Sequence, residues 1–206
     1  MIRNIIFDVG KVLIGWEPHQ TMIEMGFSKE ARDTIQREIF DTGLWKEEDR
    51  GVIKGVELED YFVAHAPEVE QEIRMFCRHA VDSVTPMPYA RDWITALQKA
   101  GYKVFVLSNF GEASQEKAVE LGAINFLDLV DGYIFSHMVH EIKPEPQIYR
   151  ILLERFGLKA EESVFLDDVE INITGAEAVG IKGILFHDYE DAVKRLRKFG
   201  VVTDPE

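Results

Sequence analysis

Short apolar runs that alternate with helical segments are the feature of this sequence that most restricts its fold. The apolar runs occupy residues 2–7, 103–107, 132–135, 163–166 and 181–186. Helical patterns lie between or after them, at 92–99, 113–121, 146–156, 171–179 and 191–199. Strands that alternate with helices predict βαβ units. We therefore expect an α/β fold in which helices cover both faces of a doubly wound parallel sheet.

The stretch from about residue 15 to residue 83 interrupts this alternation. It has no clear buried strand, and its helical patterns cover 28–40, 57–66 and 67–80. Pro86 and Pro88 mark the return of the chain to the α/β part. The sequence predicts two domains: a core made of 1–14 and 84–206, and an inserted helical domain made of 15–83.

The formal net charge of −14 restricts the possible partners. A surface this negative repels nucleic acid and anionic membranes, and its simplest role is to keep the protein soluble. It also repels phosphate esters, so a phosphorylated substrate would need a local counter-charge such as a divalent cation. The single cysteine, Cys77, excludes an internal disulfide, and no export signal or membrane span is visible. We expect a soluble, cytoplasmic protein that acts on a small molecule, while the sequence leaves its oligomeric state open.

Polar residues follow the apolar runs at the points where the predicted strands end. They are Asp8, Ser108, Asn109, Asp167 and Asp168. Ligands of parallel α/β sheets bind at the carboxyl ends of the strands, so these side chains are candidates for a shared site. Taken singly, each also fits an ordinary turn or helix-capping residue.

The adjacent carboxylates of Asp167 and Asp168 favour a cation nearby, because two such groups repel each other. Magnesium typically takes one or two carboxylates together with substrate phosphate. Lys143 precedes the helix predicted at 146–156 and could neutralise an aspartate nucleophile and a phosphate.

Four segments in order resemble the motifs of the haloacid-dehalogenase-like (HAD) hydrolase superfamily. They are FDVGKVL at 7–13, VLSNF at 106–110, Lys143 in KPEPQIY, and FLDDVEINITGA at 165–176. The first motif resembles a branch of small phosphatases that includes sugar-1-phosphate phosphatases and the N-terminal phosphatase domain of some epoxide hydrolases. The resemblance implies a core sheet with strand order 3-2-1-4-5 and a helical cap domain of the first-position type.

The resemblance also implies roles for the residues that match. Asp8 would be the nucleophile and form an aspartyl-phosphate, and Ser108 and Asn109 would bind the transferring phosphoryl group. Lys143 would hold Asp8 and the phosphate together.

The cofactor implied by the resemblance is Mg²⁺. Asp8, the backbone carbonyl of Gly10 and Asp168 would ligate it, and Asp167 would either ligate the ion or orient its ligands. Asn172 would support this acidic loop.

Gly10 is the one departure from the family pattern. Family phosphatases usually carry at this position a second aspartate, which protonates the leaving group. Three explanations stay open. Glu17 or His19 could supply the proton, the substrate could have a good leaving group such as an anomeric phosphate, or the protein could bind phosphorylated ligands with little turnover.

The sequence as a whole predicts a magnesium-dependent phosphatase that hydrolyses a small phosphate monoester, such as a sugar 1-phosphate. A metal-independent dehalogenase fits less well, because such enzymes lack the paired acids of Asp167 and Asp168. A phosphomutase would need the aspartate that Gly10 replaces. Trp16 and Phe110 could also touch the substrate.

Overall fold

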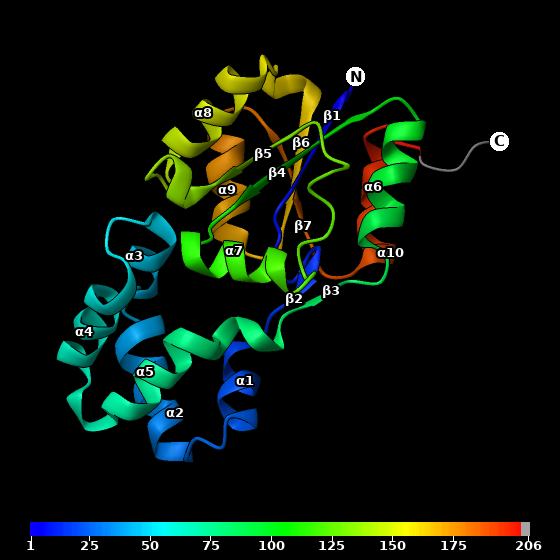
Figure 1. Ribbon diagram of the computed structural model, residues 1–206. Coiled ribbons are helices and arrows are strands. Elements are labelled where there is room, and N and C mark those ends of the chain that lie inside the picture. The colour runs from blue at the N-terminus through cyan, green and yellow to red at the C-terminus, as the bar shows by residue number, and fades with distance from the viewer. Residues whose placement is uncertain (203–206) are drawn as a thin grey trace.

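The computed structural model describes residues 1–202 and places a helical lobe beside an α/β core (Figure 1). The core contains a five-stranded parallel sheet with the order β5-β4-β1-β6-β7. Its strands are β1 (Asn4–Phe7), β4 (Lys103–Ser108), β5 (Gly132–Phe135), β6 (Ser163–Asp167) and β7 (Lys182–Leu185). Counted along the chain within this sheet, that order is 3-2-1-4-5, which confirms the predicted topology.

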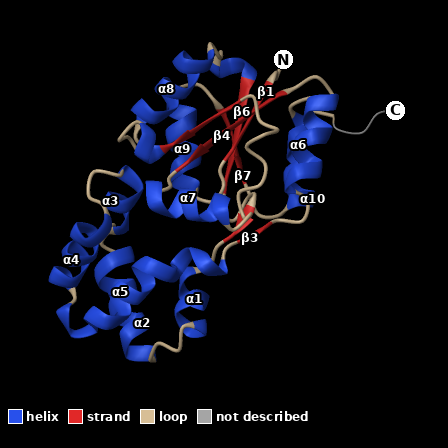
Figure 2. Ribbon diagram, in the orientation of Figure 1, coloured by secondary structure: helices blue, strands red, loops and turns tan. Residues whose placement is uncertain are grey.

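Helices cover both faces of the sheet (Figure 2). The core helices are α6 (Ala90–Lys99), α7 (Glu112–Glu120), α8 (Pro146–Phe156), α9 (Glu170–Ala178) and α10 (Tyr189–Lys198). Successive residues of β1 face opposite sides: Ile5 and Phe7 pack into one buried cluster with α6 and α10, and Ile6 packs into another with α8 and α9. The central strand is therefore apolar on both faces, as a buried parallel strand requires.

The register of the sheet brings three chain segments to one edge. Phe7 pairs with Val106 on one side and with Leu166 on the other. The backbone N–H of Asp8 then donates to the carbonyl of Leu166 over 2.9 Å. Residues that follow β1, β4 and β6 therefore emerge together, on the side of the sheet that faces the helical lobe (Figure 1).

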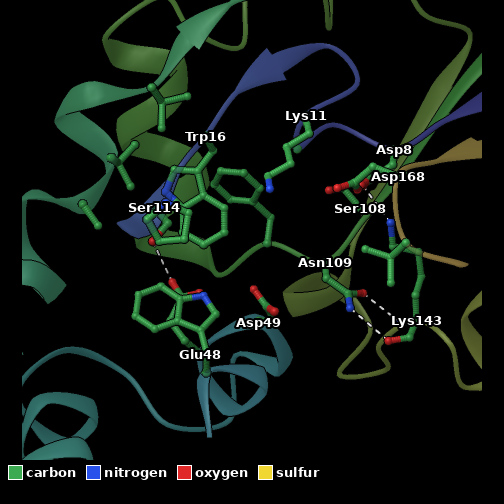
Figure 3. A pocket seen from close by; sticks show the side chains of 18 of the residues that line it. Asp8, Lys11, Trp16, Glu48, Asp49, Ser108, Asn109, Ser114, Lys143 and Asp168 are labelled. Atoms are coloured by element: carbon green, nitrogen blue, oxygen red, sulfur yellow. Dashed lines mark hydrogen bonds and ion pairs between the residues drawn. The ribbon is translucent and has the colours of Figure 1, made fainter. Parts of the chain in front are cut away.

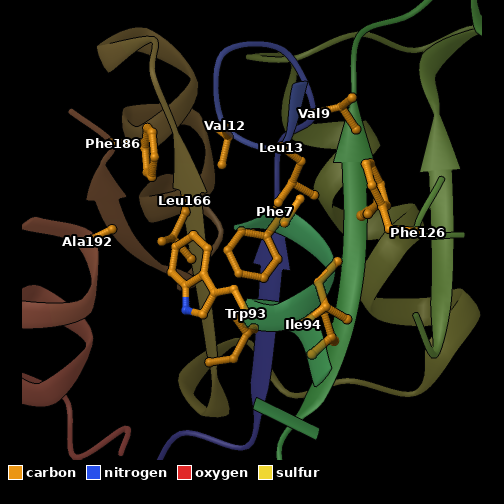
Figure 4. Close-up of a cluster of buried hydrophobic side chains, with 14 of the residues drawn as sticks. Phe7, Val9, Val12, Leu13, Trp93, Ile94, Phe126, Leu166, Phe186 and Ala192 are labelled. Atoms are coloured by element: carbon orange, nitrogen blue, oxygen red, sulfur yellow. The ribbon is translucent and has the colours of Figure 1, made fainter. Parts of the chain in front are cut away.

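Aromatic packing holds β1 against α6 (Figure 4). The rings of Phe7 and Trp93 meet edge to face with centroids 4.7 Å apart, and Trp93 also contacts Tyr189 at 5.0 Å. Trp93 is only 1% exposed. Because Phe7 directly precedes Asp8, this packing fixes the point at which the chain leaves the sheet.

The helical lobe comprises residues 16–84. Its helices are α1 (Pro18–Glu24), α2 (Lys29–Ile35), α3 (Trp45–Arg50), α4 (Gly55–His65) and α5 (Glu70–His79), with a π-helical turn at Gln36–Phe40. Short 3₁₀ turns lie at Pro67–Val69 and Ala80–Ser83 here, and at Ser136–Met138 and Ala160–Glu162 in the core. The lobe has its own buried cluster, in which Trp45 stacks on Phe62 with ring centroids 5.6 Å apart.

Two chain crossings join the lobe to the core. There β2 (Ile14–Gly15) pairs antiparallel with β3 (Thr85–Pro86). A separate buried cluster is what a folding domain needs, but the boundaries at residues 15 and 83 stay a prediction. Within residues 1–202, no helix has the length and apolar character needed to cross a bilayer.

The packing of Trp93 generates a first prediction. Trp93→Ala should lower the free energy of unfolding by about 3–5 kcal/mol, because it leaves a cavity between α6 and β1. Urea unfolding followed by circular dichroism measures the loss. Val52→Ala, at a position that is 62% exposed, is the control and should cost less than about 0.5 kcal/mol. Equal losses in the two variants would contradict this account of the core.

Candidate functional site

A cavity of about 310 Å³ lies between the carboxyl edge of the sheet and the helical lobe (Figure 3). Most residues singled out by the sequence line it: Asp8, Gly10, Ser108, Asn109, Lys143, Asp168 and Asn172. Asp167 is fully buried just beneath, in contact with Lys143. The structure does not bring Glu17 and His19 to the lining, and both are exposed.

Lys143 stands between two buried carboxylates. Its Nζ lies 2.7 Å from Oδ1 of Asp8 and 2.6 Å from Oδ2 of Asp167, and the residue is 2% exposed. Burial by itself would lower the pKa of Lys143, but the charges of Asp167 and Asp8 outweigh it and raise that pKa. Lys143 is therefore a fixed positive charge at the base of the pocket.

Asp167 has its oxygens occupied. Oδ2 contacts Lys143, and Oδ1 accepts from the backbone N–H of Val169 over 2.8 Å. The Asn172 amide donates to both oxygens over 3.1 Å. The carbonyl of Asn172 in turn accepts from the Tyr149 hydroxyl over 2.7 Å. Asp167 is thus placed to orient Lys143. Asn172 connects α9 to the end of β6 through these hydrogen bonds, and its supporting role in the site stays a prediction.

The carboxyl of Asp8 has a raised pKa and fewer hydrogen-bond donors than that of Asp167. Burial raises the pKa of Asp8 to about 7, Lys143 opposes that rise, and Asp167 adds to it. Its Oδ1 forms the ion pair with Lys143, and the Ser108 hydroxyl hydrogen-bonds the carboxyl. These two donors leave lone pairs of the carboxylate unused, so Asp8 can still bind a cation or an electrophile.

The donor set at this edge fits a hard divalent cation. Oxygens of Asp8, Asp167 and Asp168 all lie within 4.8 Å of one another. Because Asp167 is already engaged, Asp8 and Asp168 are the carboxylates left to bind an ion. Burial raises the pKa of Asp168 and the charge of Asp167 adds to this, a repulsion that a cation would relieve.

The side chain of Asn109 hydrogen-bonds the backbone of Lys143. Its amide donates to the carbonyl of Lys143 over 3.0 Å and accepts from the backbone N–H of Lys143 over 2.8 Å. It therefore ties the end of β4 to the loop that carries Lys143. Ser108 is 1% exposed and its hydroxyl lies beside Asp8. Phosphate binding by either side chain stays a prediction.

Two acidic residues in the pocket could not be recognised from the sequence. Glu48 and Asp49 come from α3, and both line the cavity. Glu48 accepts from the Ser114 hydroxyl over 2.7 Å. The approach to Gly111 is so close that a Cβ there would lie 2.0 Å from Oε1 of Glu48. The segment WKEEDR lacks a helical pattern of apolar residues, so nothing distinguishes these two acids from solvated surface charges.

One wall of the pocket is apolar. It contains Trp16, Trp45, Val81, Val84 and Phe110. The rings of Trp16 and Trp45 lie 6.1 Å apart. The prediction that Trp16 and Phe110 could touch the substrate agrees with their positions, while Trp45 was not singled out.

The ion pairs of Lys143 generate a second prediction. Lys143→Met should lower the free energy of unfolding of the metal-free protein by about 3–5 kcal/mol at pH 8, since Asp8 and Asp167 lose their buried partner. Without Lys143 the pKa of Asp8, which burial already raises, rises further, so the folded state binds more protons than the unfolded state. The loss should therefore be smaller at pH 5 than at pH 8.

Urea unfolding in EDTA at the two pH values tests this. Lys159→Met removes an exposed ion pair with Glu162 and should cost less than about 1 kcal/mol at both. A loss for Lys143→Met that does not depend on pH would argue against the buried pairs as its cause.

Comparison with known proteins agrees with this geometry. Over 113 residues the chain is 34% identical to Bifunctional epoxide hydrolase 2 of Mus musculus, a match that covers 54% of this chain and 20% of that protein. It is 24% identical over 193 residues to a sesquiterpene phosphatase of Aspergillus oryzae, which covers 94% of each. The chain thus spans about a fifth of the epoxide hydrolase and nearly all of the sesquiterpene phosphatase.

Solved structures share the fold. A HAD family enzyme of Bacteroides thetaiotaomicron, in complex with magnesium and inorganic phosphate, superposes with a TM-score of 0.73 at 21% identity, covering 93% of this chain and 99% of that one. The family model of the haloacid dehalogenase-like hydrolases matches residues 2–180, which include all four motifs and the pocket that they form. The chain therefore belongs to the haloacid dehalogenase-like hydrolase family.

Proposed function

We propose that the protein is a magnesium-dependent phosphatase that hydrolyses a small phosphate monoester through an aspartyl-phosphate on Asp8. The observation that carries this is the environment of Asp8. Its carboxyl faces the pocket, is paired with the buried ammonium of Lys143, and lies beside a second carboxyl group, Asp168, that is free to bind a cation.

Asp8, Lys143 and Ser108 would each have a separate role in phosphoryl transfer. One oxygen of Asp8 attacks phosphorus, and Lys143 keeps the carboxylate ionised and balances charge on the phosphoryl oxygens. The Ser108 hydroxyl, beside Asp8, can donate to a phosphoryl oxygen. Asp167 does not react, because Lys143, Asn172 and the N–H of Val169 occupy it.

Asp8, Asp168 and the backbone carbonyl of Gly10 would hold Mg²⁺. When bound, the ion neutralises negative charge on the transferring phosphoryl group, which the strongly acidic surface would otherwise repel. The complex of the Bacteroides enzyme with magnesium and phosphate supports this part of the proposal.

The names of relatives support a phosphatase over a dehalogenase. The sesquiterpene phosphatase matches over nearly its whole length. The paired acids Asp167 and Asp168 also favour phosphate over a carbon–halogen bond, for which no metal is needed. Binding with little turnover is the remaining alternative, and Gly10 is the residue that motivates it.

The substrate is expected to pair a phosphate with a compact organic group. The sequence favours a sugar phosphate such as an anomeric 1-phosphate. The apolar wall with Trp16, Trp45 and Phe110 fits the C–H face of a sugar ring and also a hydrocarbon group. A panel of sugar 1-phosphates, sugar 6-phosphates and prenyl phosphates, ranked by kcat/KM, separates these classes.

Magnesium and Asp8 generate a third prediction. The wild-type protein should release phosphate from p-nitrophenyl phosphate with Mg²⁺ and lose this activity in EDTA. Asp8→Asn should lower kcat by at least about 10³-fold, since it removes the nucleophile. Asp92→Asn, on the exposed side of α6, is the matched control and should keep wild-type activity.

Two results would overturn the proposal. One is phosphate release that Asp8→Asn leaves intact. The other is halide release from 2-chloropropionate in EDTA without any phosphatase activity, which would establish the dehalogenase instead.

A further inference from the structure

The position two residues after the nucleophile offers no acid. Gly10 has no side chain, and Glu17 and His19 do not line the pocket. Glu17 is exposed and pairs with Lys11 over 3.4 Å. A proton donor for the leaving group must therefore come from elsewhere in the lining if the reaction is assisted.

Four carboxyl groups line the pocket, and three of them have other tasks. Asp8 is the proposed nucleophile and Asp168 a proposed metal ligand. Glu48 is held by the Ser114 hydroxyl at 2.7 Å and by the backbone N–H of Gly111. The fourth is Asp49.

Asp49 lies on the side of the pocket that an acid would need. It belongs to α3, and Figure 3 shows its carboxyl across the cavity from Asp8 and Ser108. In phosphoryl transfer the leaving oxygen departs opposite the attacking oxygen. A phosphorus atom attacked by Asp8 would therefore direct its leaving group towards the helical lobe, where Asp49 stands.

The core fixes the position of α3. Ser136 donates to the backbone carbonyl of Asp49, and Arg50 forms a two-fold contact with Glu145 at 2.6 and 3.1 Å. Gly51 ends the helix with a φ of +70°, and a Cβ at that position would come within 2.7 Å of His137. These contacts fix the backbone of Asp49 at the edge of the pocket.

The charges around Asp49 favour its protonated form. Burial raises its pKa well above the ordinary value, the negative charges of Glu48 and Asp8 add to this, and Lys143 opposes it. Glu48 and Asp49 also hydrogen-bond each other. Because Ser114 and Gly111 already donate to Glu48, the proton that the two acids share is better placed on Asp49.

We propose that Asp49 is the general acid and base of the phosphatase reaction, in place of the residue missing at Gly10; this rests on the function proposed above. As the bond from Asp8 to phosphorus forms, the bond from phosphorus to the leaving oxygen breaks, and the Asp49 proton moves to that oxygen. An alcohol leaves and Asp49 becomes a carboxylate. Asp49 then takes a proton from water as the water oxygen bonds to phosphorus, the bond to Asp8 breaks, and inorganic phosphate forms.

The test compares substrates that differ in their need for a proton. The leaving group of p-nitrophenyl phosphate is a weak base and departs without help, whereas that of benzyl phosphate is an alkoxide and requires protonation. Asp49→Asn should lower kcat/KM for benzyl phosphate by about 10²–10⁴-fold and for p-nitrophenyl phosphate by less than about 10-fold. The fall of kcat/KM for benzyl phosphate at high pH in the wild type should disappear in this variant.

Restoring an acid at residue 10 gives a second variant. A Cβ at Gly10 would meet nothing within 4 Å, so Gly10→Asp can be accommodated. Added to Asp49→Asn, it should recover at least about 10-fold in kcat/KM for benzyl phosphate, whereas added to the wild type it should change that value little; a purely structural role for Asp49 would not produce this difference. Glu47→Gln, on the same helix but outside the pocket lining, is the matched control and should behave as wild type.

The outcomes separate this inference from the proposed function. Equal losses on both substrates, full activity of Asp49→Asn, or a wild type that hydrolyses only p-nitrophenyl phosphate would overturn the role of Asp49. A wild type that releases no phosphate from either substrate with Mg²⁺ would overturn the phosphatase itself. Neither substrate carries a hydroxyl group, so a role of Asp49 in binding a sugar hydroxyl would leave both rates unchanged.

Discussion

The buried ammonium of Lys143 is the interaction on which the rest of the site depends. It contacts Asp8 at 2.7 Å and Asp167 at 2.6 Å, and all three groups are almost fully withdrawn from water. Each charge alone would be costly to bury, so the three are stable only together. Because they come from the ends of β1 and β6 and from the loop before α8, the sheet must form in the right register before the ion pairs can exist. Asn109 and Asn172 then fix the two loops around them.

Much of the core could be predicted because its elements are long or fully apolar. The helix expected at 146–156 and the strand at 132–135 have the bounds of α8 and β5, and the other core elements differ by one or two residues at their ends. In the helical lobe, the helix expected at 28–40 is regular only to Ile35 and continues as a π-helical turn. The short helices α1 and α3 were missed altogether. They carry too few apolar residues to show a period, and contacts with the core and the rest of the lobe stabilise them.

The site also contains residues that could be predicted from the sequence and residues that could not. Asp8, Ser108, Lys143 and Asp168 line one pocket, since each ends or follows a strand, or precedes a helix, whose place in the fold is set by topology. Their roles stay predictions. The sequence could not show that Asp167 is saturated by internal donors, because that depends on side-chain geometry. It also could not show Glu48 and Asp49, because they come from a helix that was not predicted and because their burial arises only where the lobe meets the core.

Gly111 determines how closely the helical lobe can approach the core. Any side chain there would collide with Glu48, which must approach closely to reach the backbone N–H of this residue. Elsewhere α3 meets the core through polar groups, with the Ser136 hydroxyl on the carbonyl of Asp49 and Glu145 on Arg50. A larger residue at position 111 would have to push Glu48, and with it α3, away from the core. The fit between the two lobes is therefore sensitive to the size of a residue that has no part in the proposed reaction.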